Sequence, residues 1–122
     1  MVTRYLTQTL TSEVRGIGPA TVDGLAEMFD VTDSTPHHDK AFLDTILYLI
    51  SRYGESLHRP EFAAEAQMIM DSFHVERTEH LDCKLSPGMF VRAVRAFSRA
   101  DKLYPGYLSQ LAANTGSFPE EP

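Results

Sequence analysis

Four of the seven prolines in this 122-residue chain stand where an α-helix is expected to begin. Pro19, Pro36, Pro60 and Pro87 are each followed by apolar residues at intervals of three and four, the spacing of one helix face. Proline suits the first helical position because its φ is already helical and because the N–H that it lacks would have no partner there. The pattern therefore predicts a helix that begins at each of these prolines.

Two shorter helices complete the prediction, one over residues 3–15 and one after Pro105. The helix over 36–57 is apolar on more than one side, so it should be buried on several sides. It either runs through the middle of the domain or forms a dimer interface over 42–57. The predicted fold class is mainly α: a single compact domain of five or six short helices over 1–115, followed by a flexible tail over 116–122.

Residues 73–85 fit two structures. Apolar side chains alternate with polar ones here, which is typical of a strand and predicts a small β-hairpin near 75–85. However, no proline or glycine separates this stretch from the preceding helix, so a continued helix fits as well.

The same stretch contains weak candidates for a metal site. Imidazole, carboxylate and thiolate groups are the ligands that zinc prefers. The candidates are His74, Glu76, His80 and Cys83. Their spacing matches no established metal-site signature, so we favour a solvated polar face with a buried cysteine and expect no metal or cofactor.

A different kind of site is indicated by the stretch Gly16-Ile17-Gly18-Pro19. Glycine allows a tight turn and a close approach of backbone or ligand. With Pro19 starting a helix, the N–H groups of Ala20 and Thr21 are expected to point outward at the positive end of the helix dipole. Such a helix end attracts anions, and phosphate is the usual one.

This stretch resembles the helix-hairpin-helix motif over about residues 6–31. The motif's apolar and glycine positions are filled by Leu10, Val14, Gly16-Ile17-Gly18, Val22 and Leu25. The resemblance implies sequence-independent contact with a DNA backbone through the N–H groups of the turn.

A basic stripe lies on the predicted helix that begins at Pro87. At 100° per residue its four cations fall within about 80° of arc, and they are Arg92, Arg95, Arg99 and Lys102. Tyr104 and Tyr107 follow directly, and aromatic rings beside cations are able to stack on bases. The alternative interpretation is an ordinary solvated face.

Composition limits the function classes. A hydrophobic content of 43% and a charged content of 23% are typical of a globular protein. The net charge of −6 repels nucleic acid except where cations cluster. A single cysteine excludes an internal disulfide, no apolar run is long enough to span a membrane, and we expect a cytoplasmic protein. No catalytic signature is present, so a non-enzymatic role is expected.

The sequence therefore predicts a small, non-enzymatic nucleic-acid-associated binding protein. The residues expected to contact nucleic acid are Arg15, Gly16, Gly18, Ala20, Thr21, Arg92, Arg95, Arg99 and Lys102. The alternative is an acidic protein–protein interaction module or small regulator, dimeric through 42–57, without nucleic-acid contact. It is motivated by the apolar third helix and by Asp23, Glu27 and Asp30 on the second helix.

Overall fold

The computed structural model describes residues 3–29, 36–72 and 85–114 of the chain. Its helices are α1 (Arg4–Glu13), α2 (Pro19–Met28), α3 (Pro36–Tyr53), the 3₁₀ helix η1 (Gly54–His58), α4 (Pro60–Ser72), α5 (Pro87–Leu103) and α6 (Tyr107–Asn114). The prediction of a mainly helical fold is confirmed, and so are the four helix starts at proline. The described residues contain no strand, and the hairpin expected near 75–85 lies outside them but for Leu85.

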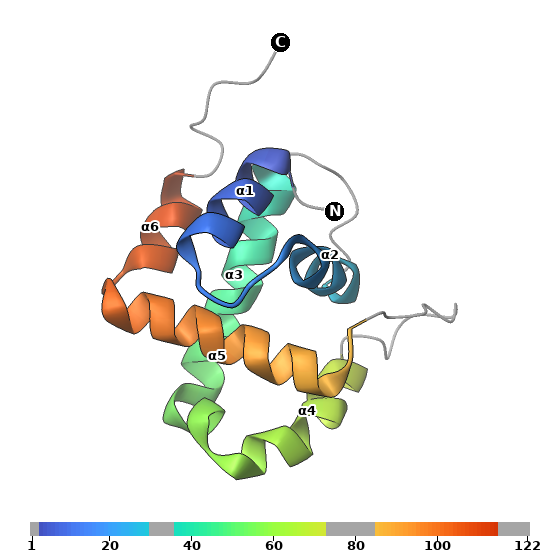
Figure 1. Cartoon of the computed structure of the whole chain (residues 1–122). Coiled ribbons are helices and arrows are strands. Elements are labelled where there is room, and N and C mark those ends of the chain that lie inside the picture. Colours follow the sequence, from blue (N-terminus) through green and yellow to red (C-terminus); the bar gives the residue numbers. More distant parts are fainter. Residues whose placement is uncertain (1–2, 30–35, 73–84, 115–122) are drawn as a thin grey trace.

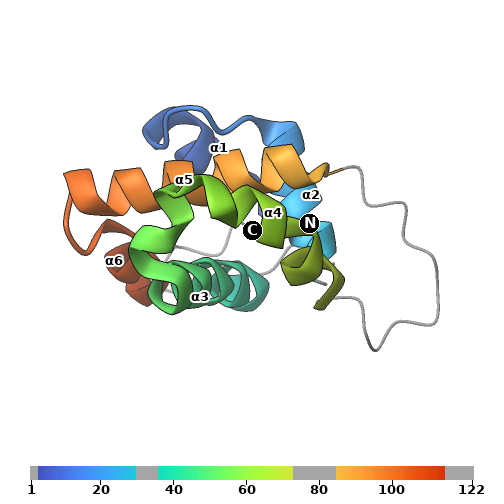
Figure 2. The ribbon, with the colours of Figure 1, turned by 90° about the horizontal axis from the view of Figure 1, so that it is seen from below.

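Helix α3 occupies the middle of the fold (Figure 1). It packs against α6, η1 and α5, while α4 packs along α5. The view from below places α3 and α5 in separate layers (Figure 2). The crossing of these two helices therefore organises the other elements around it.

Phenylalanine side chains form much of the core at this crossing. Phe42, Phe62, Phe90 and Phe97 are fully buried. The Phe42 ring centroid lies 5.6 Å from that of Phe29, which joins α3 to the end of α2. Phe62 lies 6.4 Å from Phe90, which joins α4 to α5. These tilted contacts are the geometry that aromatic pairs prefer.

The wide apolar surface of α3 is covered by the chain itself. Phe42, Leu43, Ile46 and Leu49 are buried, and the partly buried apolar side chains of α3 pack against the same core. Tyr48 is the one large apolar side chain of α3 counted among the exposed ones in the described residues. The central position explains the sequence pattern, and a dimer through 42–57 stays a prediction.

One helix boundary differs from the prediction. The third helix was expected to continue to about Leu57, but α3 ends at Tyr53 and a 3₁₀ turn follows. The reason is Gly54, whose φ of +52° is incompatible with a continued right-handed helix and is tolerated by glycine. The change of direction lets Leu57 turn into the core, where it is fully buried.

Capping residues define two helix starts. The Thr3 side chain accepts a hydrogen bond from the Leu6 N–H at 3.2 Å, so Thr3 caps α1 from outside the helix. Ser86 accepts one from the Met89 N–H at 3.2 Å and so caps α5. Each cap satisfies a backbone donor that has no intrahelical acceptor.

A buried carboxylate fastens α1 to α3. Asp39 is 2% exposed and accepts hydrogen bonds from the N–H of Thr3, at 2.8 Å, and from its hydroxyl group. Because the charge is removed from water, these two donors are what make its burial tolerable. Among the described helices, none is long and apolar enough to cross a membrane.

We expect Asp39→Ala to lower the free energy of unfolding by about 1–3 kcal/mol, because the half-buried Thr3 donors lose their acceptor. Urea denaturation followed by circular dichroism measures the change. Asp44→Ala, at an exposed position of the same helix, is the matched control and should change stability by less than about 0.5 kcal/mol. Equal effects of the two variants would show that Asp39 does not hold α1.

Candidate nucleic-acid interface

The connection between α1 and α2 is a tight turn, as the sequence predicts. Gly16 has a φ of +96°, in the left-handed region that favours glycine. Ile17 is 5% exposed and anchors the turn in the core, and its N–H donates to the Val14 carbonyl. Gly18 is the N-cap of α2, with an extended backbone. The buried isoleucine thus holds two glycines at the surface.

The N-terminus of α2 is less open than expected. The N–H groups of Thr21 and Val22 both donate to the Gly18 carbonyl, at 3.1 Å each. The expectation that the Thr21 N–H points freely outward is therefore wrong, because the first turn tightens and uses this donor internally. For the Ala20 N–H, the described part of the chain supplies no acceptor. A Cβ atom added at Gly16 or Gly18 would meet nothing within 4 Å, so a ligand can approach this backbone.

The basic stripe on α5 divides into residues with different surroundings. Arg92, Arg99 and Lys102 are exposed, whereas Arg95 is half-buried. The Arg95 guanidinium donates to the carbonyl of Leu57 and, at 2.9 Å, to that of Arg59. These carbonyls close the end of η1, so Arg95 joins α5 to that turn and its donors are engaged within the chain.

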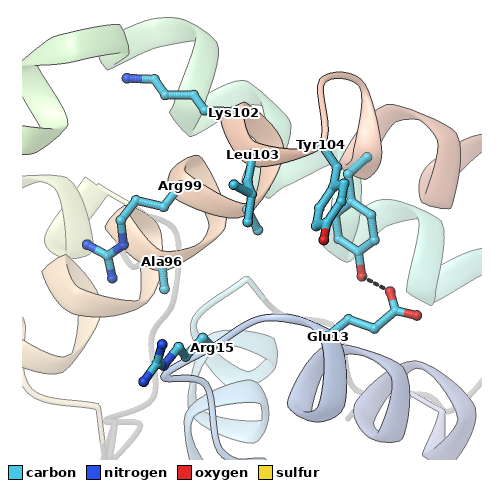
Figure 3. Close-up of a pocket in the computed structure, with 9 residues that line it drawn as sticks. Glu13, Arg15, Ala96, Arg99, Lys102, Leu103 and Tyr104 are labelled. Carbon is cyan, nitrogen blue, oxygen red and sulfur yellow. Dashed lines mark hydrogen bonds between the residues drawn. The ribbon is translucent and has the colours of Figure 1, made fainter.

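A groove joins the two sequence-predicted regions (Figure 3). It is open to solvent and has a volume of about 890 Å³. The α1–α2 turn contributes Arg15, and the last turns of α5 contribute Arg99 and Lys102. The other lining residues are Glu13, Ala96, Ala100, Leu103, Tyr104 and Tyr107. Two stretches more than eighty residues apart in the sequence therefore form a single surface.

Charge is distributed unevenly around the groove. In Figure 3 the charged ends of Arg15, Arg99 and Lys102 lie on one side, and the carboxylate of Glu13 lies on the other. No hydrogen bond or ion pair engages these three cations within the described part of the chain. They are therefore available to an anion from solution.

The acidic side of the groove is fixed by a hydrogen bond. The Tyr107 hydroxyl donates to the Glu13 carboxylate, which ties α6 to the end of α1. Burial raises the pKa of Tyr107 above its ordinary value, and the hydrogen bond and charge of Glu13 raise it further. Tyr107 therefore stays a neutral donor, and Glu13 is directed to it and away from the cations.

Beyond the groove, the positive charge of α5 acts on His58. Burial lowers the pKa of His58, and nearby cations lower it further. These cations are Lys102, Arg99 and Arg95, while Glu55 opposes them. The residues that form the basic stripe thus disfavour the protonated form of the His58 imidazole.

His58 also contacts a serine. Its Nε2 lies 3.3 Å from the Oγ of Ser98, a pairing that activates serine nucleophiles in some enzymes. Ser98 is 2% exposed, however, and sits within α5. A substrate does not reach this hydroxyl, and the contact instead gives a buried polar group its partner.

The structure brings together only part of the predicted site. Arg15, Arg99 and Lys102 share the groove, and Arg92 lies outside its lining. Sequence reasoning missed Glu13 and Leu103, and it noted the two tyrosines only as neighbours of the stripe. No spacing rule would have found Glu13, because its place depends on the docking of α6.

The metal candidates His74, Glu76, His80 and Cys83 lie outside the described residues. Within 3–29, 36–72 and 85–114, no cluster of three or more histidine, cysteine, aspartate or glutamate side chains could hold a metal ion.

Replacing Arg95 by alanine should lower the free energy of unfolding by about 1–3 kcal/mol, because two carbonyl groups lose a charged donor. Arg92→Ala removes an equal charge from an exposed position of the same helix and should cost less than about 0.5 kcal/mol. Chemical denaturation of both variants makes the comparison. A similar loss in both would assign the effect to helix charge instead of to the η1 contact.

Stability should also depend on pH through His58. Its pKa in the folded chain is lower than in the unfolded chain, so the folded state binds fewer protons and stability falls as pH drops through about 6.5. A His58→Asn variant lacks this loss. We expect the melting temperature of the native chain to decline relative to that of the variant between about pH 8 and pH 5, and a constant difference would contradict the assignment.

Comparison of the chain with protein-family models, with curated proteins and with solved structures gives no match in any of the three.

Proposed function

We propose that this protein is a small, non-enzymatic nucleic-acid-associated binding protein. The observation that supports the proposal is the groove, because it places Arg15 of the predicted phosphate-binding turn beside Arg99 and Lys102 of the basic stripe. The planar guanidinium group of arginine donates paired hydrogen bonds that match the geometry of phosphate oxygens. Cationic side chains also supply most of the affinity for a nucleic-acid backbone.

The local charge is opposite to that of the whole chain. The net charge is −6, yet the groove is lined by three cations and one carboxylate, a local balance of +2. That carboxylate, Glu13, is engaged by Tyr107. An anionic polymer would therefore be repelled by most of the surface and attracted here, which orients it on the protein.

The glycine turn follows Arg15 directly and offers one backbone donor, although its glycines and Ala20 are not among the residues that line the groove. Gly16 and Gly18 leave room for a close approach, and the Ala20 N–H lies at the start of α2, where the helix dipole favours an anion. In this proposal the turn holds one phosphate, and the arginines beside it provide the charge.

Fluorescence anisotropy with labelled oligonucleotides at two salt concentrations tests the proposal. We expect Arg15→Gln and Arg99→Gln each to weaken binding and to reduce the slope of log affinity against log salt by about one, since each removes one phosphate contact.

Arg92→Gln is the matched control, because it removes an exposed arginine of α5 outside the groove and should leave the slope nearly unchanged. The absence of binding even at low salt would overturn the proposal.

A protein-interaction module is the second candidate function. Leu103 and Tyr104 are 72% and 66% exposed and lie next to each other at the groove. On α2, the acidic side chains of Asp23 and Glu27 are exposed. Adjacent exposed apolar side chains are a feature of docking surfaces. Failure of all oligonucleotides to bind in the titration is the result that would favour this function.

A further inference from the structure

We infer that the groove accommodates one unpaired base, so that the protein binds single-stranded nucleic acid in preference to a duplex. The inference rests on the proposed function and specifies its ligand. It starts from a property of the groove that phosphate contact alone does not require, namely its apolar lining.

The apolar part of the lining is continuous along α5. Ala96 and Ala100 are one turn apart and have small side chains, and Leu103 follows on the next turn. Contact with a phosphate backbone needs exposed cations and does not need an apolar hollow. A hollow lined by methyl groups and aromatic rings suits a flat, weakly polar ligand, while the cations beside it suit an anion. A nucleotide has both parts, because its flat base is attached to an anionic phosphate.

Tyr104 is placed to stack on such a base. Its backbone is held, because its N–H donates to the Ala100 carbonyl at 3.1 Å as α5 ends. Its side chain is 66% exposed and makes no hydrogen bond within the described residues. The other groove tyrosine, Tyr107, is committed to Glu13. An exposed ring on a fixed stretch of backbone has a face available for a ligand.

The charges then indicate on which side of the groove the phosphate of a nucleotide would lie. In Figure 3 the cationic ends of Arg15 and Arg99 lie on one side of Leu103, and Tyr104 lies on the other. A nucleotide lying across the groove would place its phosphate on the arginines and its base against Tyr104. The volume of about 890 Å³ falls within the roughly 300–1,000 Å³ of sites that enclose small ligands.

A duplex cannot use this site in the same way. Its bases are paired and stacked, and one enters a pocket only after it is extruded from the helix at a cost in free energy. A single strand has no base pair to break, so its cost is smaller, and the preference follows from the shape of the groove and does not depend on sequence.

The test uses the full chain with a labelled thymidine oligomer and with a duplex of the same length, at low salt. We expect the single strand to bind at least about tenfold more tightly. Tyr104→Ala should weaken the single strand by about 5- to 100-fold, the effect of removing one stacking ring, and should leave the duplex nearly unchanged. Tyr104→Phe should retain the affinity, because the ring face remains.

Tyr48→Ala is the matched control, since it removes a tyrosine of similar exposure, 60%, from α3 outside the groove. Equal binding of single strand and duplex, with no effect of Tyr104→Ala, would overturn this inference and leave the proposed function in place. If neither oligonucleotide bound, the inference and the proposed function would both be overturned. Loss of single-strand affinity in the Tyr48 variant as well would show that Tyr104 has no particular role.

Discussion

The burial of α3 is the constraint on which the other elements depend. Its apolar surface is too wide for one neighbour to cover, so α5, α6 and η1 all pack against it. The chain meets this demand by leaving the helical path at Gly54, which turns Leu57 inward and starts the return along α4. The position of α5, and hence of its charged face, follows from this packing.

Burial also decides which charged groups are free to act. Arg95 is drawn into contact with the carbonyls at the end of η1, while Arg99, one turn later, reaches the groove. Residues that look equivalent on a helical wheel therefore differ in role. The lowered pKa of His58 has the same origin, because the turn that Arg95 holds partly buries the imidazole and also brings it close to the cations.

Features that depend only on residues close together in the sequence could be predicted from it. The helix starts at proline and the Gly16–Gly18 turn are local, and the structure has them. The end of α3 was missed because a glycine within a helical pattern is compatible with a continued helix and with a break. Tertiary packing determines which of the two forms. The groove was missed because it arises where the α1–α2 turn meets α5 and α6, and no pattern in a single segment records that meeting.

The hydrogen bond between Tyr107 and Glu13 joins residues 94 positions apart. The groove walls consequently come from the end of α1, the turn after it, α5 and the start of α6, and α2, α3, η1 and α4 contribute none of its lining. A molecule held there would stabilise the arrangement in which the end of α1, α5 and the start of α6 lie together. Occupancy would thus slow local opening at these two outer helices and protect their amides from exchange, even though the ligand touches only a few of their residues.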